Sequence, residues 1–335
     1  MSRYTYDKTS KELDMIAGVP AMDSTPVEDS IKPITSGGVY DAISSVKEYI
    51  QHNVPRLIPK DITEYVTDGT LWQRLNGTDG FELFEDLFVG DYIHMSRPIS
   101  AYNQDQTYQA TGSEYVTIAG IDTLWGNGDN NADAPNITYH HLVMIPGQGL
   151  AGTEHFGRSR MNPTNTTTGG YVGSEMFTTT IGPVTSTGST ATTATINEQL
   201  YAEFGSHLKT IRELLTNAII DSGASATTGY NRFGTNSGCA AGWAWTSVQA
   251  CLMSEVEVYG SIVWDSTGYD TGTGKAQLPL FEHSETDVND RTSSYWLRGV
   301  ASGAGFCLVD GNGSAYCTVA SNAGAYVCPR FVLGA

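Results

Sequence analysis

The sequence predicts an α+β fold, and three patterns carry this prediction. Segments rich in apolar residues at 114–121 and 140–146 are typical of strands. Apolar residues that recur every three or four positions from Ile196 to Ile219 predict one helix. Residues 290–335 contain a strand, a hairpin and a closing strand. Charged residues make up only 16% of the 335-residue chain, which is typical of a loop-rich extracellular or virion protein.

Residues 1–35 predict an extended arm. Pro20, Pro26 and Pro33 interrupt any helix, and no periodic apolar pattern accompanies them. A segment without a core of its own needs the surface of a partner to become ordered. We therefore expect this arm to dock on another protein.

Residues 36–54 predict a helical stem that assembles three chains. Its apolar residues stand four, three and four positions apart, which is the spacing of a coiled-coil seam. They are Val39, Ile43, Val46 and Ile50. β-branched residues at both seam positions favour trimers over dimers. An amphipathic helix that packs on its own domain is the alternative interpretation.

Residues 55–80 predict a connector between the stem and the main domain. Pro55 and Pro59 end the stem helix, because proline interrupts helical hydrogen bonding. Short strand-like pieces follow at 64–66 and 70–72.

The main domain is expected to span residues 81–335. A strand opens it within 84–93, and a short helix is expected near 175–179. The longer predicted helix, 196–219, places acidic residues such as Glu213 on its polar face.

The hairpin near the C-terminus is the clearest local signal. Segments 306–309 and 315–319 flank the turn 310–314, whose Asp, Gly and Asn residues accept positive φ angles. Trp296 in the preceding strand is the expected core anchor. An inward-facing Arg298 beside it would need a carboxylate or carbonyl partner. The apolar closing strand is expected to tie the C-terminus into a sheet.

Five cysteines lie at positions 239, 251, 307, 317 and 328. None of them has Cys-x-x-Cys spacing, and the Asp/Asn loop 126–136 lacks EF-hand spacing. We therefore expect no metal site and no cofactor. Cys307 and Cys317 would face each other across the hairpin, and the sequence leaves open whether they form a disulfide or stay as buried thiols.

Two resemblances to known families add to these patterns. Residues 33–42, Pro-Ile-Thr-Ser-Gly-Gly-Val-Tyr-Asp-Ala, resemble a segment common in phage tail, baseplate and head-fibre proteins, where it precedes a trimeric helical stem. Across 81–335, motifs in a shared order resemble a poorly characterised family of bacterial and phage domains with a C-type-lectin-like fold. These motifs lie at 90–93, 169–174, 252–260, 296–298 and 329–331.

The second resemblance also bears on single residues. It implies that Glu255 is structural and accepts hydrogen bonds from a turn. The chain departs from the family at Cys328, which precedes Pro329 where the family has arginine. This departure leaves the role of Arg330 open.

The sequence lacks the motifs of an enzyme. It contains no Gly-x-Ser-x-Gly, no His-Glu-x-x-His and no phosphate-binding glycine loop. His140 and His141 fall in an apolar strand, where one of two consecutive side chains points into the core. Glu255 and Glu257 are spaced as a carboxylate pair, but the resemblance assigns Glu255 to structure. We therefore expect no catalytic activity.

Charge and hydropathy limit the partners. The formal net charge of −18 repels phosphate backbones, so we expect no nucleic-acid partner. No run approaches the roughly 20 apolar residues of a membrane span, so we expect no membrane insertion. The first residues are polar and lack an apolar segment, so we expect no signal peptide. A chain that has the composition of a surface protein but is made in a cytoplasm is expected to be part of a virion.

The resulting expectation is a phage virion appendage. It is a homotrimer whose arm docks on a capsid or tail protein and whose lectin-like domain binds a host-surface glycan or protein. The candidate binding residues are Ser302, Gly303, Asn312, Ser314, Tyr316, Ser321, Asn322 and Tyr326. The alternative is a structural head-fibre or capsid decoration protein without receptor binding, and a sugar-cleaving enzyme is third.

Overall fold

The computed structural model describes residues 52–102, 112–148, 155–219, 240–265, 276–283 and 294–335. The chain divides into two units, Met1–Gln51 and His52–Ala335, and every described residue belongs to the second unit. The predicted arm and most of the predicted stem lie outside the described residues.

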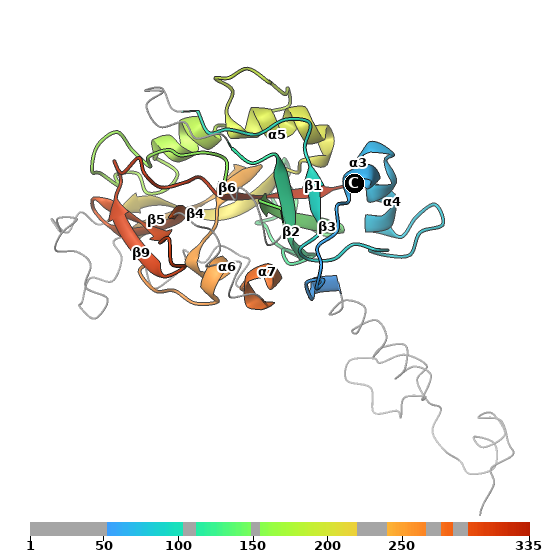
Figure 1. The fold of residues 1–335 in the computed structure, drawn as a ribbon. Coiled ribbons are helices and arrows are strands. Elements are labelled where there is room, and N and C mark those ends of the chain that lie inside the picture. Colours follow the sequence, from blue (N-terminus) through green and yellow to red (C-terminus); the bar gives the residue numbers. More distant parts are fainter. Residues whose placement is uncertain (1–51, 103–111, 149–154, 220–239, 266–275, 284–293) are drawn as a thin grey trace, which may run out of the picture. The chain divides into compact units, whose positions relative to one another are not determined.

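A five-stranded antiparallel sheet forms the centre of this unit (Figure 1), in the order β1-β2-β3-β10-β6. Its strands are β1 Tyr92–His94, β2 Tyr115–Ile121, β3 His141–Pro146, β6 Ala250–Leu252 and β10 Pro329–Gly334. The strands expected at 114–121 and 140–146 are therefore confirmed, and the strand expected within 84–93 is β1, which begins only at Tyr92. β10 lies between β3 and β6, so the last strand of the chain is held by hydrogen bonds on both edges.

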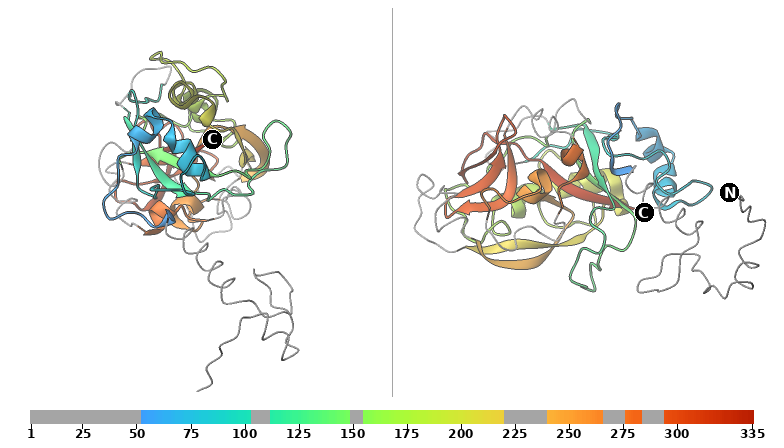
Figure 2. Two further views of the ribbon diagram at one scale, coloured as in Figure 1. Left: turned by 90° about the vertical axis from the view of Figure 1, so that its right-hand side faces the viewer. Right: turned by 90° about the horizontal axis from the view of Figure 1, so that it is seen from below.

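A separate three-stranded sheet carries the predicted hairpin. It consists of β7 Tyr295–Ser302, β8 Gly305–Val309 and β9 Ala315–Val319, in that order. The register pairs Cys307 with Cys317, as the hairpin pattern predicted, and no disulfide joins the two side chains. Figures 1 and 2 show that this sheet and the pair of helices α3 and α4 lie at opposite ends of the unit.

The remaining elements are short helices and one long hairpin. α3 Thr63–Thr67 and α4 Thr70–Asn76 precede the central sheet, and a π-helix Met176–Ile181 and α5 Ile196–Phe204 follow β3. β4 Ile211–Ile219 and β5 Ala240–Val248 form a two-stranded antiparallel pair. α6 Glu255–Tyr259 and α7 Pro279–His283 complete the set. The mixture of helices and antiparallel sheets confirms an α+β composition.

The predicted helix at 196–219 is wrong in its second half. A capping box begins α5, because the Thr195 side chain accepts from the Glu198 backbone and the Glu198 side chain accepts from the Thr195 backbone. The helix ends at Gly205, whose φ of 56° suits glycine. Residues 211–219 form strand β4 instead. A spacing of four positions keeps residues on one face in both helices and strands, so Ile211, Leu215 and Ile219 fitted either element.

The predicted connector at 55–80 belongs to the same unit as the main domain, which begins at His52. The pieces expected as strands are the helices α3 and α4. Leu71 and Leu75, one helical turn apart on α4, are fully buried in the core that also contains the central strands. Among the described residues, no helix has both the length and the apolar character needed to cross a bilayer.

Candidate functional site

The exposed face of the hairpin β8–β9 carries a pocket of about 350 Å³. Leu308 and Ala325 give it an apolar floor, and Tyr316, Thr318 and Asn322 give it polar groups. Its other lining residues are Ser294, Asp310 and Gly324. We call this site the hairpin pocket. Tyr316 is its most prominent side chain, because 54% of its surface is exposed.

Hydrogen bonds hold the loops around the hairpin pocket in place. Oδ1 of Asp310 accepts from the backbone N–H groups of Asn312 and Ser314, each at 2.9 Å. Oδ1 of Asn322 accepts from the backbone N–H of Gly324 at 2.8 Å. The hydroxyl of Tyr259 donates to the carbonyl of Gly313 at 2.9 Å. A ligand therefore meets a prearranged surface, which lowers the entropy lost on binding.

The predicted binding residues do not form one patch. Gly303 lies in the turn between β7 and β8, whereas Asn312 and Ser314 lie in the turn at the other end of β8. A five-residue strand separates these turns by about 17 Å. Ser321 lies on the Gly303 side, where it donates to the side chain of Asn165.

Two of the predicted binding residues are buried and cannot form an exposed surface. Ser302 is 2% exposed at the end of β7, where its carbonyl accepts from Thr167. Tyr326 is 8% exposed, and its ring stacks on His155 with centroids 3.6 Å apart. The hydroxyl of Tyr326 also accepts a hydrogen bond from Arg158. Of the eight candidates, Tyr316 and Asn322 line the hairpin pocket.

The residues expected to be structural lie in the interior. Trp296 is fully buried, and its indole N–H donates to the carbonyl of Ser159 at 2.8 Å. Arg298 is also buried and donates to Glu257 at 2.9 Å, so a carboxylate is its partner. Glu255 accepts from the backbone N–H groups of residues 263, 264 and 265, which form a turn. The four seam residues of the predicted stem, 39, 43, 46 and 50, lie outside the described residues.

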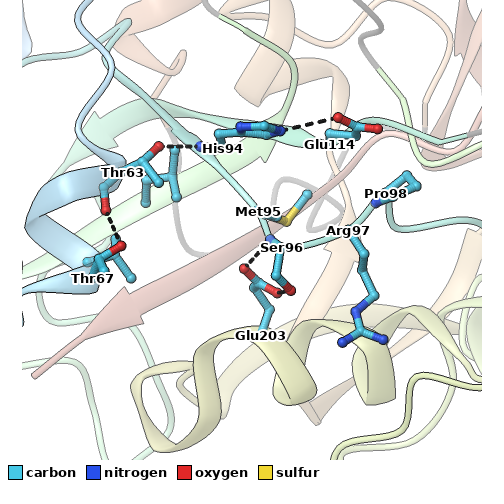
Figure 3. A pocket seen from close by; sticks show the side chains of 11 residues that line it. Thr63, Thr67, His94, Met95, Ser96, Arg97, Pro98, Glu114 and Glu203 are labelled. Carbon is cyan, nitrogen blue, oxygen red and sulfur yellow. Dashed lines mark hydrogen bonds and ion pairs between the residues drawn. The ribbon is translucent and has the colours of Figure 1, made fainter.

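A second pocket, of about 610 Å³, lies beside the edge strand β1 (Figure 3). We call it the edge pocket. Residues 93–98 form one wall, α3 supplies Thr63 and Thr67, and Glu203 comes from α5. Its remaining lining residues are Val66 and Glu114. No local motif marks this pocket, because its residues come from four separate segments between Thr63 and Glu203.

The polar groups of the edge pocket are mostly paired with each other. Nε2 of His94 lies 3.2 Å from Glu114, and Ser96 donates to Glu203 through both its backbone N–H and its hydroxyl. The Ser96 hydroxyl thus contacts a carboxylate and not the imidazole of His94, which differs from the serine–histidine contact of a nucleophilic hydrolase. The exposed hydroxyls and carboxylates can accept hydrogen bonds from a polar, hydroxyl-rich ligand.

The histidine and glutamate side chains that were candidates for catalysis make structural contacts. His141 is buried, and its Nε2 accepts from the backbone N–H of Leu124 at 3.1 Å. Nδ1 of His140 lies 2.7 Å from Oδ2 of Asp122. Glu255 and Glu257 are both 1% exposed, so neither reaches a polysaccharide. Within the described ranges, no group of His, Cys, Asp and Glu residues has the arrangement of a metal site.

No protein-family model, curated protein or solved structure matches this chain.

Proposed function

We propose that this chain is a trimeric phage virion appendage that binds a host-surface glycan or protein through the hairpin pocket. Residues 1–35 dock on a capsid or tail protein, residues 36–54 form the trimeric stem, and the remainder presents the pocket. The fold we propose for this remainder is C-type-lectin-like.

The order of elements supports that fold proposal. Strand β3 is followed by two helical segments, the π-helix and α5, and later by the three-stranded sheet β7–β9. The last strand, β10, then returns to pair with β3 in antiparallel register. A domain whose last strand is fixed between two strands of the central sheet can vary its outer loops while the sheet holds their ends.

The observation that carries the binding proposal is the exposed ring of Tyr316 on a fixed hairpin. Aromatic rings supply a large contact area with little loss of side-chain freedom. Thr318 and Asn322 beside it offer hydrogen-bonding groups, and Leu308 offers an apolar floor. This combination fits the alternating apolar and hydroxyl-bearing surface of a sugar ring, or an exposed peptide side chain. Three copies on one stem would raise a weak single-site affinity by avidity.

The test is binding of the full-length chain to a panel of bacterial cells, with the variant Y316A and the matched control V184A. Val184 is also an exposed apolar side chain, and it lies outside the pocket. Truncating a tyrosine at the centre of a contact weakens binding by tens-fold. We expect such a loss for Y316A and none for V184A.

Three outcomes separate the proposals. Equal binding by Y316A and wild type would refute the role of the hairpin pocket. A wild-type chain that is incorporated into virions but binds no cell in the panel would favour the structural decoration protein. Release of soluble sugar from the cell envelope would favour an enzyme.

A further inference from the structure

The hairpin pocket is built on one face of the hairpin β8–β9. The register places Leu308 opposite Tyr316, and residues two positions apart along a strand point to the same side. Asp310 follows Leu308 by two positions and Thr318 follows Tyr316 by two positions, and all four residues line the pocket. The aromatic ring and the carboxylate therefore belong to one surface.

Asp310 keeps one carboxylate oxygen for a ligand. Its Oδ1 accepts from the backbone N–H groups of Asn312 and Ser314, each at 2.9 Å, and so holds the turn. The side chain is partly exposed, and no residue in the described part of the chain donates a hydrogen bond to its Oδ2. Because a carboxylate accepts hydrogen bonds and donates none, Oδ2 suits a ligand that donates.

The other polar groups of the pocket include donors as well as acceptors. Ser294, Tyr316 and Thr318 bring hydroxyl groups, which both donate and accept. The amide oxygen of Asn322 accepts from the backbone N–H of Gly324 at 2.8 Å, and its nitrogen lies 3.4 Å from the Thr318 hydroxyl. The second hydrogen of that nitrogen remains for a ligand. A ligand with several hydroxyl groups matches this set, since each hydroxyl can donate to Oδ2 of Asp310 or accept from the amide.

The charge of the pocket selects among such ligands. Asp310 is the one charged group among the described lining residues. A second negative group placed beside it is repelled. The formal net charge of −18 on the whole chain adds to this repulsion. Sugars that carry a carboxylate or a phosphate are therefore disfavoured, and uncharged sugars are not.

We propose that the hairpin pocket binds an uncharged pyranose of a host-surface glycan and that Asp310 excludes acidic and phosphorylated sugars. This inference rests on the proposed binding function and narrows its ligand to one class of glycan. The apolar face of the pyranose lies on the ring of Tyr316, which is 54% exposed. The sugar hydroxyls donate to Oδ2 of Asp310 and accept from the amide of Asn322.

The size and the polar groups of the pocket favour a sugar over a peptide. A volume of about 350 Å³ lies at the lower end of the range of small-ligand sites, so the pocket admits a sugar ring or a single side chain. A lysine or arginine side chain would suit Asp310 and the ring of Tyr316. Such a side chain carries donors only, however, and has nothing to accept from the amide of Asn322.

The experiment measures the binding of free sugars to the full-length chain by ligand-observed NMR titration. The probes are glucose, galactose and mannose, each compared with its uronic acid and its 6-phosphate. Lysine with both its ends capped as amides is the probe for a peptide ligand. Wild type is compared with Y316A, which removes the ring, and with D310N.

D310N has a matched control in D68N. The asparagine in D310N keeps an oxygen that can hold the turn and places an amide where Oδ2 was. Asp68 is also an exposed turn residue, and its Oδ1 accepts from the backbone N–H of Thr70 at 2.8 Å. It lies outside the hairpin pocket, so D68N makes the same chemical change elsewhere.

We expect at least one neutral sugar to bind wild type about tenfold or more tightly than its uronic acid and its phosphate. A hydrogen bond to a charged group changes an equilibrium by about tenfold to a hundredfold. D310N should therefore weaken binding of the neutral sugar by that factor and bring the affinities of the neutral and acidic forms closer together. D68N should match wild type, and Y316A should lose binding of the neutral sugar.

The outcomes separate this inference from the function proposed above. If an acidic or phosphorylated sugar binds wild type as tightly as its neutral form, the inference is wrong and the pocket remains a binding site. If only the lysine probe binds, the ligand is a basic peptide. If no probe binds, the inference fails, while the proposed function still stands where Y316A loses binding to cells. The comparison of neutral and acidic sugars on wild type needs no variant, so it is decisive even if D310N does not fold.

Discussion

Replacing Glu257 with glutamine tests how four buried charges stabilise the fold. Glu213, Glu257, Arg298 and Arg330 are each at most 1% exposed, and they comprise two carboxylates and two guanidinium groups. Arg330 donates to both carboxylates, and Arg298 donates to Glu257 at 2.9 Å. Glu257 also accepts from the backbone N–H of Ser254 at 2.7 Å. The cluster is therefore electrically balanced. Glu257 is the carboxylate that accepts hydrogen bonds from both arginines.

The variant E257Q keeps the shape of the side chain and removes its charge. One uncompensated guanidinium charge is then buried, and breaking a buried ion pair in this way costs about 3–5 kcal/mol in the free energy of unfolding. For a unit of this size a loss of 1 kcal/mol lowers the melting temperature by about 2 °C. We therefore expect E257Q to melt roughly 6–10 °C below wild type.

The assay is thermal and urea unfolding at neutral pH, followed by tryptophan fluorescence and circular dichroism. The matched control is E85Q, because the Glu85 side chain is 39% exposed and pairs with Arg74 at 3.3 Å on the surface. Exposed pairs contribute less than about 1 kcal/mol, so E85Q should stay close to wild type. If the free energy of unfolding of E257Q lies within 1 kcal/mol of that of E85Q, the four charges are solvated and the reasoning is wrong.

A second variant keeps the test decisive if E257Q does not fold. E257Q/R298M removes one charge of each sign and leaves Glu213 and Arg330 as a balanced pair. Residues in one ion-pair network do not add independently. We expect the double variant to be more stable than E257Q, because it restores the charge balance of the interior.

Three further predictions follow from individual groups. Burial acts to raise the pKa of Glu257, but the charges of Arg298 and Arg330 outweigh it and hold this pKa below its usual range. The Glu257 charge therefore stabilises the fold above about pH 4.3, the ordinary pKa of a glutamate in an unfolded chain, and this stabilisation is lost as the pH falls further. The unfolding curves of wild type and E257Q should converge in acid. Burial raises the pKa of Cys317 to about 12, so mass spectrometry should find this thiol unlabelled by alkylating reagents at pH 8 until the protein unfolds. T195A removes the cap of α5 and should cost about 1 kcal/mol in urea unfolding.

The strands of the fold were predictable because their signal is local. In β2 and β3 the apolar runs are short and bounded by turn residues, and both strands are almost entirely buried. The hairpin β8–β9 was predictable for a related reason. Its turn at 310–314 is rich in residues that accept positive φ, and Gly313 adopts a φ of 79°.

The segment after Gly205 could not be assigned from spacing alone. Glu213 shows the consequence most clearly, since a helical period places it on the polar face. In strand β4 the period is two, and Ile211, Glu213 and Leu215 all point inward. A glutamate enters the core because Arg330, from a segment 117 positions away, donates a hydrogen bond to it, as does the side chain of Asn127. No local pattern encodes either partner.

The candidate site was predictable in part. The composition of the hairpin indicated an exposed aromatic residue, and Tyr316 does line a pocket. Ser302 was expected on the exposed binding surface but is buried, because the end of β7 packs against the segment that contains Thr167. The edge pocket had no sequence signal, because His94 and Glu203 become neighbours only through the packing of α5 beside β1.

The positions of the charge cluster and of the hairpin pocket imply that stability and binding can change independently. The cluster joins β4, α6, β7 and β10, whereas the pocket is built mainly on β8 and β9 and the segment after them. Tyr316 is half exposed and contributes little to the core, so Y316A should weaken binding and leave the melting temperature within about 1 °C of wild type.

E257Q should give the opposite result. It should lower the melting temperature and leave the affinity of the folded chain unchanged, when both variants are measured below the melting transition of E257Q. If E257Q weakens binding as strongly as Y316A while the chain is still folded, then the cluster positions the hairpin through Arg298 on β7, and the two properties are coupled.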